Sequence, residues 1–131
     1  MIRALLIFYG AGSIAAGLET LVGWSAAHSG PFSSFATALA YEIPHGLYGR
    51  MVWGGLWALA APLLSLPKLG WLQASLLLSL FPTVAQLLYF FPQSGGGFFG
   101  LNHGWATPLA VGARNIFWAL VTTGIGNRAG R

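Results

Sequence analysis

Three ionisable side chains, Glu19, Arg50 and Arg114, interrupt apolar runs in a sequence of which only 6% of the residues are charged. A charged side chain inside a bilayer costs about 2.5–3.5 kcal/mol to insert, so it usually faces the interior of a helix bundle and finds a partner there. Two arginines against one glutamate leave one positive charge in excess. The candidate chemistry is therefore ion pairing, with the excess charge open to water, an anion or a partner protein.

Helical spacing places these polar groups on faces made of small or hydroxylated residues. The residues that share a face are Gly12, Ala16 and Gly23 with Glu19; Gly54, Ala58 and Ala61 with Arg50; and Ser75, Ser79 and Thr83 with Gln86. Such faces are typical of close packing between membrane helices. We therefore predict an inward-facing intramembrane polar cluster of Glu19, Arg50, Gln86 and Arg114.

Counting from the expected outer ends of the helices places Glu19, Arg50, Gln86 and Thr107 at a similar depth, and Arg114 deeper. Three interpretations of the cluster are open at this point. Glu19 forms an interhelical ion pair with one of the two arginines, which fixes the helix register. Alternatively, the cluster lines a polar vestibule that opens to the outer side and admits an anion, a lipid headgroup or a proton-coupled solute. In the third interpretation, another subunit balances the excess charge.

A second polar group lies at the outer ends of the helices and comprises His28, Glu42, His45 and His103. Imidazole is a common metal ligand, so three histidines could hold an ion. No two of them are four residues apart on one helix, however, and no carboxylate pattern accompanies them. We expect histidines that cap helices or sense pH, with no metal, cofactor or catalytic residue. The chain contains no cysteine, which excludes thiolate chemistry.

The elements that position these groups follow from the composition, because 56% hydrophobic residues is far from a soluble globular chain. A helix needs roughly 20 apolar residues to cross a bilayer. Four segments qualify, at about 2–24, 46–66, 69–91 and 104–126. The sequence predicts an all-α fold: residues 1–131 form a single integral membrane domain, a bundle of four spanning helices.

Basic residues give the expected orientation of the bundle. Arg3, Lys68, Arg128 and Arg131 all fall on one side, whereas the loops 25–44 and 92–103 contain no Lys or Arg. By the positive-inside rule, both termini are expected in the cytoplasm, in a bacterial-type inner (plasma) membrane. Six basic residues scattered in this way do not form the patch that nucleic-acid binding requires.

The connections differ in length. Pro67 and Lys68 join the second and third helices in a tight antiparallel hairpin. In the first outer loop, apolar residues recur at helical spacing between Pro31 and Pro44, which predicts a short interfacial helix or a partly re-entrant segment. The glycine-rich segment 93–100 has no regular period and is expected to be a flexible outer loop.

Small size, an aromatic-rich surface and an unbalanced buried arginine favour a protein that works by association. We expect a non-enzymatic accessory or scaffolding subunit of a membrane complex or homo-oligomer, with membrane lipids, other membrane subunits or a second copy as partners. The alternative is a transporter or channel for a small solute or ion that uses the outer-facing polar vestibule.

Overall fold

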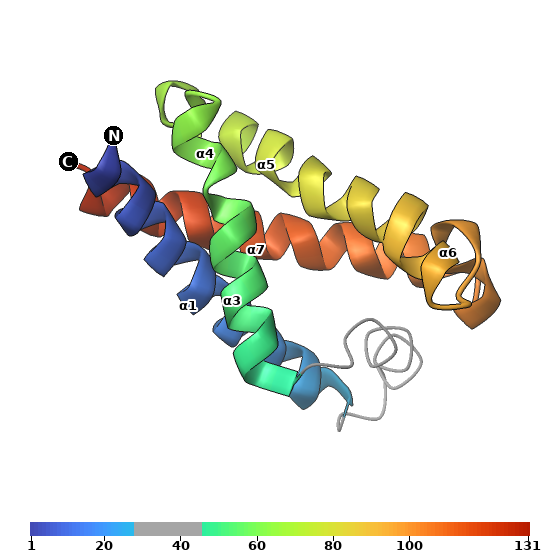
Figure 1. Ribbon diagram of the computed structural model, residues 1–131. Helices are drawn as coiled ribbons and strands as arrows, with labels where there is room; N and C mark the ends of the chain where they lie inside the picture. The colour runs from blue at the N-terminus through green and yellow to red at the C-terminus, as the bar shows by residue number, and fades with distance from the viewer. Residues whose placement is uncertain (28–45) are drawn as a thin grey trace.

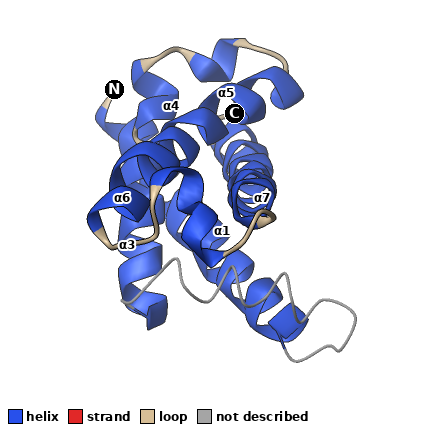
Figure 2. Cartoon of the chain, turned by 90° about the vertical axis from the view of Figure 1, so that its right-hand side faces the viewer, coloured by secondary structure: helices blue, strands red, loops and turns tan. Residues whose placement is uncertain are grey.

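The structure is a computed structural model, and it describes residues 1–27 and 46–131. Throughout these residues the chain forms helices and turns, with no strand (Figures 1 and 2). Three helices are long and apolar enough to cross a membrane, at Ile2–Ser25, Trp71–Gln93 and Thr107–Ala129. The predicted all-α class and membrane character are confirmed. The predicted interfacial helix in the first outer loop lies outside the described residues.

The described residues form nine helical elements. They are α1 (Ile2–Ala27), α3 (Gly46–Ala58), α4 (Ala60–Leu63), the 3-10 turn η2 (Leu66–Lys68), α5 (Trp71–Ala85), the π-helical segment η3 (Gln86–Phe90), α6 (Phe91–Gln93), the 3-10 segment η4 (Phe98–His103) and α7 (Thr107–Ala129).

The second predicted span differs from the structure. We expected one helix over 46–66, but α3 ends at Ala58, and α4 begins only after a turn at Leu59. Pro62 explains the break, because proline has no N–H to donate to the carbonyl of Ala58 four residues earlier. The N–H of Leu59 instead bonds to the carbonyl of Leu56, three residues back, at 3.2 Å. The helix over 46–66 is thus interrupted at Leu59, and a single membrane crossing by α3 and α4 together stays a prediction.

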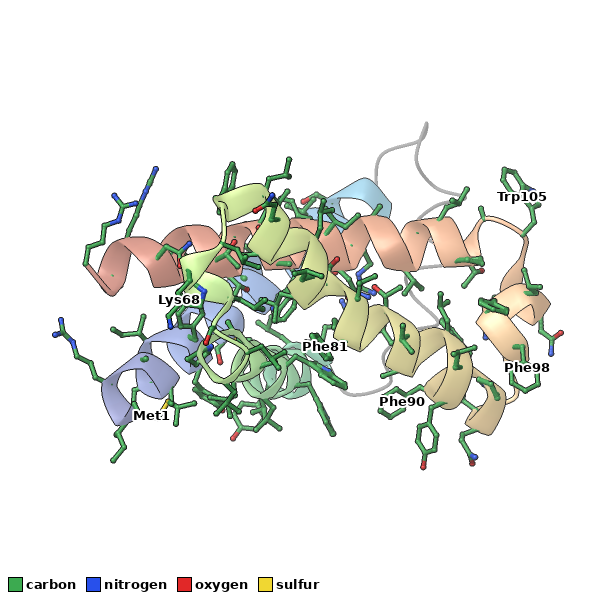
Figure 3. The ribbon with its side chains drawn as sticks, turned by 90° about the horizontal axis from the view of Figure 1, so that it is seen from above. Met1, Lys68, Phe81, Phe90, Phe98 and Trp105 are labelled. Carbon is green, nitrogen blue, oxygen red and sulfur yellow. The ribbon has the colours of Figure 1, made fainter. Side chains whose placement is uncertain are left out.

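The helices pack in a row in the order α3, α1, α7 and α5, which we divide into two pairs, α1 with α3 and α5 with α7. α3 packs on α1, α5 packs on α7, and α1 packs on α7, whereas α3 and α5 touch only marginally. Figure 1 shows that the N- and C-termini lie together at one end of the molecule and that the two pairs diverge from there. Met1 and Lys68 lie toward that end, and Phe98 and Trp105 lie at the opposite end (Figure 3). We call the end near Trp105 the outer end.

Glycines bring α1 and α3 into backbone contact. A Cβ atom on Gly12 would lie 2.4 Å from the carbonyl oxygen of Gly54, and one on Gly54 would lie 2.7 Å from the carbonyl oxygen of Gly12. Real Cβ atoms do not approach a carbonyl this closely, so only glycine fits at either position. This crossing sets how close α3 lies to the rest of the molecule.

Hydrogen bonds join α5 to α7. The hydroxyls of Ser75 and Thr123 are buried and lie 2.7 Å apart. The indole Nε1 of Trp71 donates to the carbonyl of Leu120 at 3.0 Å. α5 and α7 are therefore held by polar contacts between larger side chains rather than by backbone approach.

The segment that was expected to be a flexible loop has a defined fold. The N–H of Gly96 donates to the carbonyl of Phe91 at 2.8 Å, and the N–H of Asn102 donates to the carbonyl of Gly96 at 3.0 Å. Gly97 and Gly100 adopt φ angles of 75° and 65°, which glycine tolerates without steric cost. These bonds hold η4 against α6, so the glycine-rich segment is a compact, hydrogen-bonded structure rather than an irregular loop.

Candidate functional site

A cavity of about 460 Å³ lies between the two helix pairs. Its wall draws on α1, α3, α5, η3, α6, η4 and α7, and it occupies the space where α3 and α5 fail to meet. All four residues of the predicted intramembrane polar cluster line it: Glu19, Arg50, Gln86 and Arg114. Of the outer-face residues, His103 lines it as well, while His28, Glu42 and His45 lie outside the described residues.

An ion pair crosses the floor of the cavity between α1 and α7. Arg114 donates from Nε to Oε1 of Glu19, and each side chain is only 11% exposed. Glu19 lies eight residues before the end of α1, and Arg114 lies seven residues after the start of α7. Each is therefore about two turns from the outer end of its helix, at the same depth. Glu19 is thus paired directly with Arg114, which was one of the two alternatives.

Arg50 stands on the opposite wall, on α3. Its Nη1 donates to the hydroxyl of Thr20 at 3.4 Å, a long and therefore weak hydrogen bond. That hydroxyl in turn donates to the carbonyl of Ala16 at 2.8 Å. The crossing of Gly12 and Gly54 one turn away fixes the position of Arg50, because it holds α3 against α1.

An amide network supplies the third polar side. Asn115 donates from Nδ2 to Thr83 Oγ1 at 2.9 Å and to Gln86 Oε1 at 3.2 Å. Gln86 is the first residue of the π-helical segment that follows Pro82. π-helical segments are uncommon in proteins, but those that occur are often found at functional sites. Their wider turn changes the direction in which side chains point. Here it brings both Gln86 and Phe90 to the cavity.

Aromatic rings form the rest of the wall. The ring centroids of Trp53 and Phe90, from opposite helix pairs, are 6.4 Å apart and the rings meet edge to face. Trp57 lies beside Trp53, at 6.4 Å. Trp118 is buried, and its Nε1 donates to the carbonyl of Gly12 at 3.1 Å, which ties α7 to the crossing of α1 and α3. The cavity wall thus combines charged and amide groups with aromatic rings.

His103 closes the outer end of the cavity. Its ring packs against that of Phe91 with centroids 5.7 Å apart, and its Nε2 lies close to Gly96. Within residues 1–27 and 46–131, no three His, Cys, Asp or Glu side chains come together as a metal site would require. Thr107, which we had placed in the same polar layer, is fully buried at the start of α7 and does not line the cavity.

The sequence-based prediction missed several residues of the wall. Trp53 and Trp57 lie three and seven residues after Arg50, so they share its helical face. Asn115 follows Arg114, and Trp118 lies four residues after Arg114. Helical spacing from the two arginines would have found Trp53, Trp57 and Trp118.

Charge decides which ligands the cavity suits. Arg50 and Arg114 carry two positive charges and Glu19 one negative charge, so these three side chains leave a net charge of +1. Volumes of about 300–1,000 Å³ are typical of pockets for small molecules. The arrangement can bind a small ligand that combines a negative group with an apolar part.

Comparison with known proteins adds no relative. No family model matches the sequence, and no match was found among curated proteins or solved structures. Any statement about function therefore depends on the cavity itself.

Proposed function

We propose that the protein is a small, non-enzymatic polytopic membrane protein that binds a solute in this cavity and belongs to the transporter or channel class. One observation carries the proposal. Polar side chains from both helix pairs, each costly to keep in lipid, converge on one cavity of about 460 Å³. An ion pair that only fixed the helix register would need no such space beside it.

The proposal includes four membrane crossings with both termini in the cytoplasm, in an inner (plasma) membrane. α3 and α4 together would make the second crossing, with the break at Leu59 inside the bilayer. The basic residues Arg3, Lys68 and Arg128 support this topology, since the positive-inside rule assigns them to the cytoplasmic face. The common position of the two termini also supports it (Figure 1).

Cysteine labelling tests the topology. Because the natural sequence contains no cysteine, any labelling reports on the introduced residue alone. In intact cells, a membrane-impermeant thiol reagent is expected to label the Leu101→Cys variant from outside. The Lys68→Cys variant should react only after the membrane is opened. The reverse pattern, or labelling of both from one side, would contradict the proposed four crossings.

The same chemistry tests the cavity. Gln86→Cys places a thiol on the cavity wall, and Leu109→Cys, whose native side chain is 62% exposed on the outside of α7, is the matched control. A transporter exposes its site to each side in turn, so the Gln86→Cys variant should react from the outside and, in inverted vesicles, from the cytoplasmic side. The control should stay unreactive. If the Gln86→Cys variant fails to react from the outside or fails to react from the cytoplasmic side, the proposed function is contradicted.

A second candidate function is association with another membrane subunit or with a second copy. The observation that favours it is the open flank between α3 and α5, where the row of helices does not close. The native mass of the protein in nanodiscs, with co-purifying proteins identified, separates the two functions. A stoichiometric partner supports the accessory role, whereas a bare monomer with a cavity reactive from both sides supports transport.

A further inference from the structure

Among the described residues that line the cavity, two arginines, Arg50 and Arg114, accompany a single carboxylate, that of Glu19. Glu19 is engaged by Arg114 across α1 and α7. Within the described part of the chain, Arg50 has one hydrogen bond, the 3.4 Å contact with Thr20. A guanidinium has five N–H donors arranged in a planar fork that matches a carboxylate or phosphate. Arg50 is therefore the group in the wall best able to accept an anionic ligand.

The part of the wall beside Arg50 is suited to hydrocarbon. Trp53, Trp57 and Phe90 present ring surfaces to the cavity. Trp53 and Phe90 are 49% and 42% exposed. Both rings line the cavity and meet at the flank where α3 and α5 hardly pack, so they stand between the cavity and the surrounding bilayer. A ligand that enters between them comes from the lipid and not from water.

At the gap between α3 and α5, the two helix pairs touch through the side chains of Trp53 and Phe90. α3 and α5 share almost no other contact, so the edge-to-face pair of Trp53 and Phe90 spans the gap between them. Phe90 is the last residue of the π-helical segment, whose wider turn sets the direction of its ring. The side-chain torsions of Trp53 and Phe90 can change without breaking any backbone hydrogen bond of a helix.

We propose that the cavity binds an amphipathic monoanion, whose negative headgroup lies against Arg50 and whose acyl chain passes between Trp53 and Phe90 into the bilayer. This deepens the proposed function and rests on it. A single negative charge neutralises the net charge of +1, whereas a cationic amphipath would double it. The shared chemistry could come from an anionic phospholipid of the membrane or from a free single-chain anion.

Quenching of tryptophan fluorescence by brominated acyl chains tests this inference in nanodiscs. The probes are dibrominated phosphatidylglycerol, a brominated long-chain alkyl sulfonate, dibrominated phosphatidylcholine and a brominated alkylammonium. Signal from the cavity is isolated as the part that is lost when Trp53 and Trp57 are both replaced by phenylalanine, which keeps the aromatic wall.

The mole fraction of probe in the bilayer that half-quenches the cavity signal is expected to be about tenfold or more lower for an anionic probe than for phosphatidylcholine or the alkylammonium. The reason is that charge-assisted bonds to a guanidinium are strong. Quenching by phosphatidylglycerol identifies a lipid headgroup. Quenching by the sulfonate alone identifies a free anion. Equal quenching by all four probes overturns the inference.

The variant Arg50→Gln should lose the preference, and Arg128→Gln, an exposed arginine outside the cavity, should keep it. A well-folded Arg50→Gln protein that keeps the preference also overturns the inference. The probe comparison on the unmodified protein stands even if that variant does not fold. The outcome is separable from the proposed function, since a cavity that reacts at Gln86→Cys from both sides but shows no headgroup preference refutes only the ligand class.

Discussion

The two helix pairs pack through different kinds of contact, α1 with α3 in one way and α5 with α7 in another. In the first pair, Gly12 and Gly54 let the two backbones touch, and any added carbon would collide with a carbonyl. In the second pair, side chains of ordinary size meet through hydrogen bonds, such as that between Ser75 and Thr123. The first contact depends on shape and the second on polarity.

The difference matters because of what each pair carries. The glycine contact holds α3 in place and with it Arg50, Trp53 and Trp57, the wall where we place the ligand. The hydrogen-bonded pair carries Asn115 on α7 and Gln86 in η3, directly after α5, and these two side chains bond to each other. Close packing at glycine is disrupted by any larger side chain, whereas a substitution in a hydrogen-bond network removes only the bonds of the substituted residue.

The largest effect is expected where the two pairs join. Glu19→Gln leaves Arg114 in a largely buried position without its carboxylate, and breaking a buried ion pair in this way costs about 3–5 kcal/mol. Unfolding in mixed micelles, followed by circular dichroism, measures the loss. The double variant Glu19→Gln/Arg114→Gln removes both charges and should recover a good part of the stability. A single variant as stable as the natural protein would refute the structural role of the pair.

The next largest effect is expected at the glycine contact. Gly54→Ala places a methyl group 2.5 Å from the Cβ of Ala16 and 2.7 Å from the carbonyl oxygen of Gly12, so the helices must separate. Overpacking of this kind costs about 1–3 kcal/mol. Gly10→Ala is the matched control, because no atom lies within 4 Å of the added carbon. The same unfolding measurement should show a loss for the first variant and none for the second, and equal effects would contradict the predicted close approach.

The sequence predicted the class of the fold well, because long apolar runs in lipid admit few alternatives. Three predicted spans, 2–24, 69–91 and 104–126, correspond to helices shifted by two or three residues at most ends. The fourth, 46–66, is divided into α3 and α4 at Leu59, since Pro62 lacks a backbone donor and apolar composition does not show where the helix is interrupted. A proline in the middle of a span needs a structure to show whether the helix bends or breaks.

The polar cluster illustrates how small errors in helix ends matter. Counted from the predicted ends, Arg114 was placed deeper than Glu19. The structure extends α1 to Ala27 and starts α7 at Thr107, and these shifts bring the two side chains level. Helical spacing identified the face of each residue, but depth depends on where each helix ends.

A smaller effect is expected in the amide network of the second pair. Asn115→Ala removes the hydrogen bonds to Thr83 and Gln86. In a double-mutant cycle, interhelical bonds of this kind in membrane proteins average about 0.6 kcal/mol. Combining Asn115→Ala with Thr83→Val isolates the bond between these two residues. A coupling energy near zero would show that the network does not hold α5 to α7.

The smallest effect is expected at Ser75, although its hydroxyl is fully buried against Thr123. Each hydroxyl also has an acceptor in its own helix, the carbonyl of Trp71 at 2.7 Å for Ser75 and that of Ala119 at 2.8 Å for Thr123. Since each hydroxyl has one proton, only one of them donates to the other, and the accepting one donates within its own helix. Ser75→Ala therefore leaves Thr123 with a partner, and the loss should stay near or below about 0.6 kcal/mol. Because hydrogen bonds with local substitutes are redundant, the second pair should tolerate this change where the glycine pair does not tolerate one methyl group. A loss at Ser75→Ala as large as that at Gly54→Ala would erase the contrast between the two pairs.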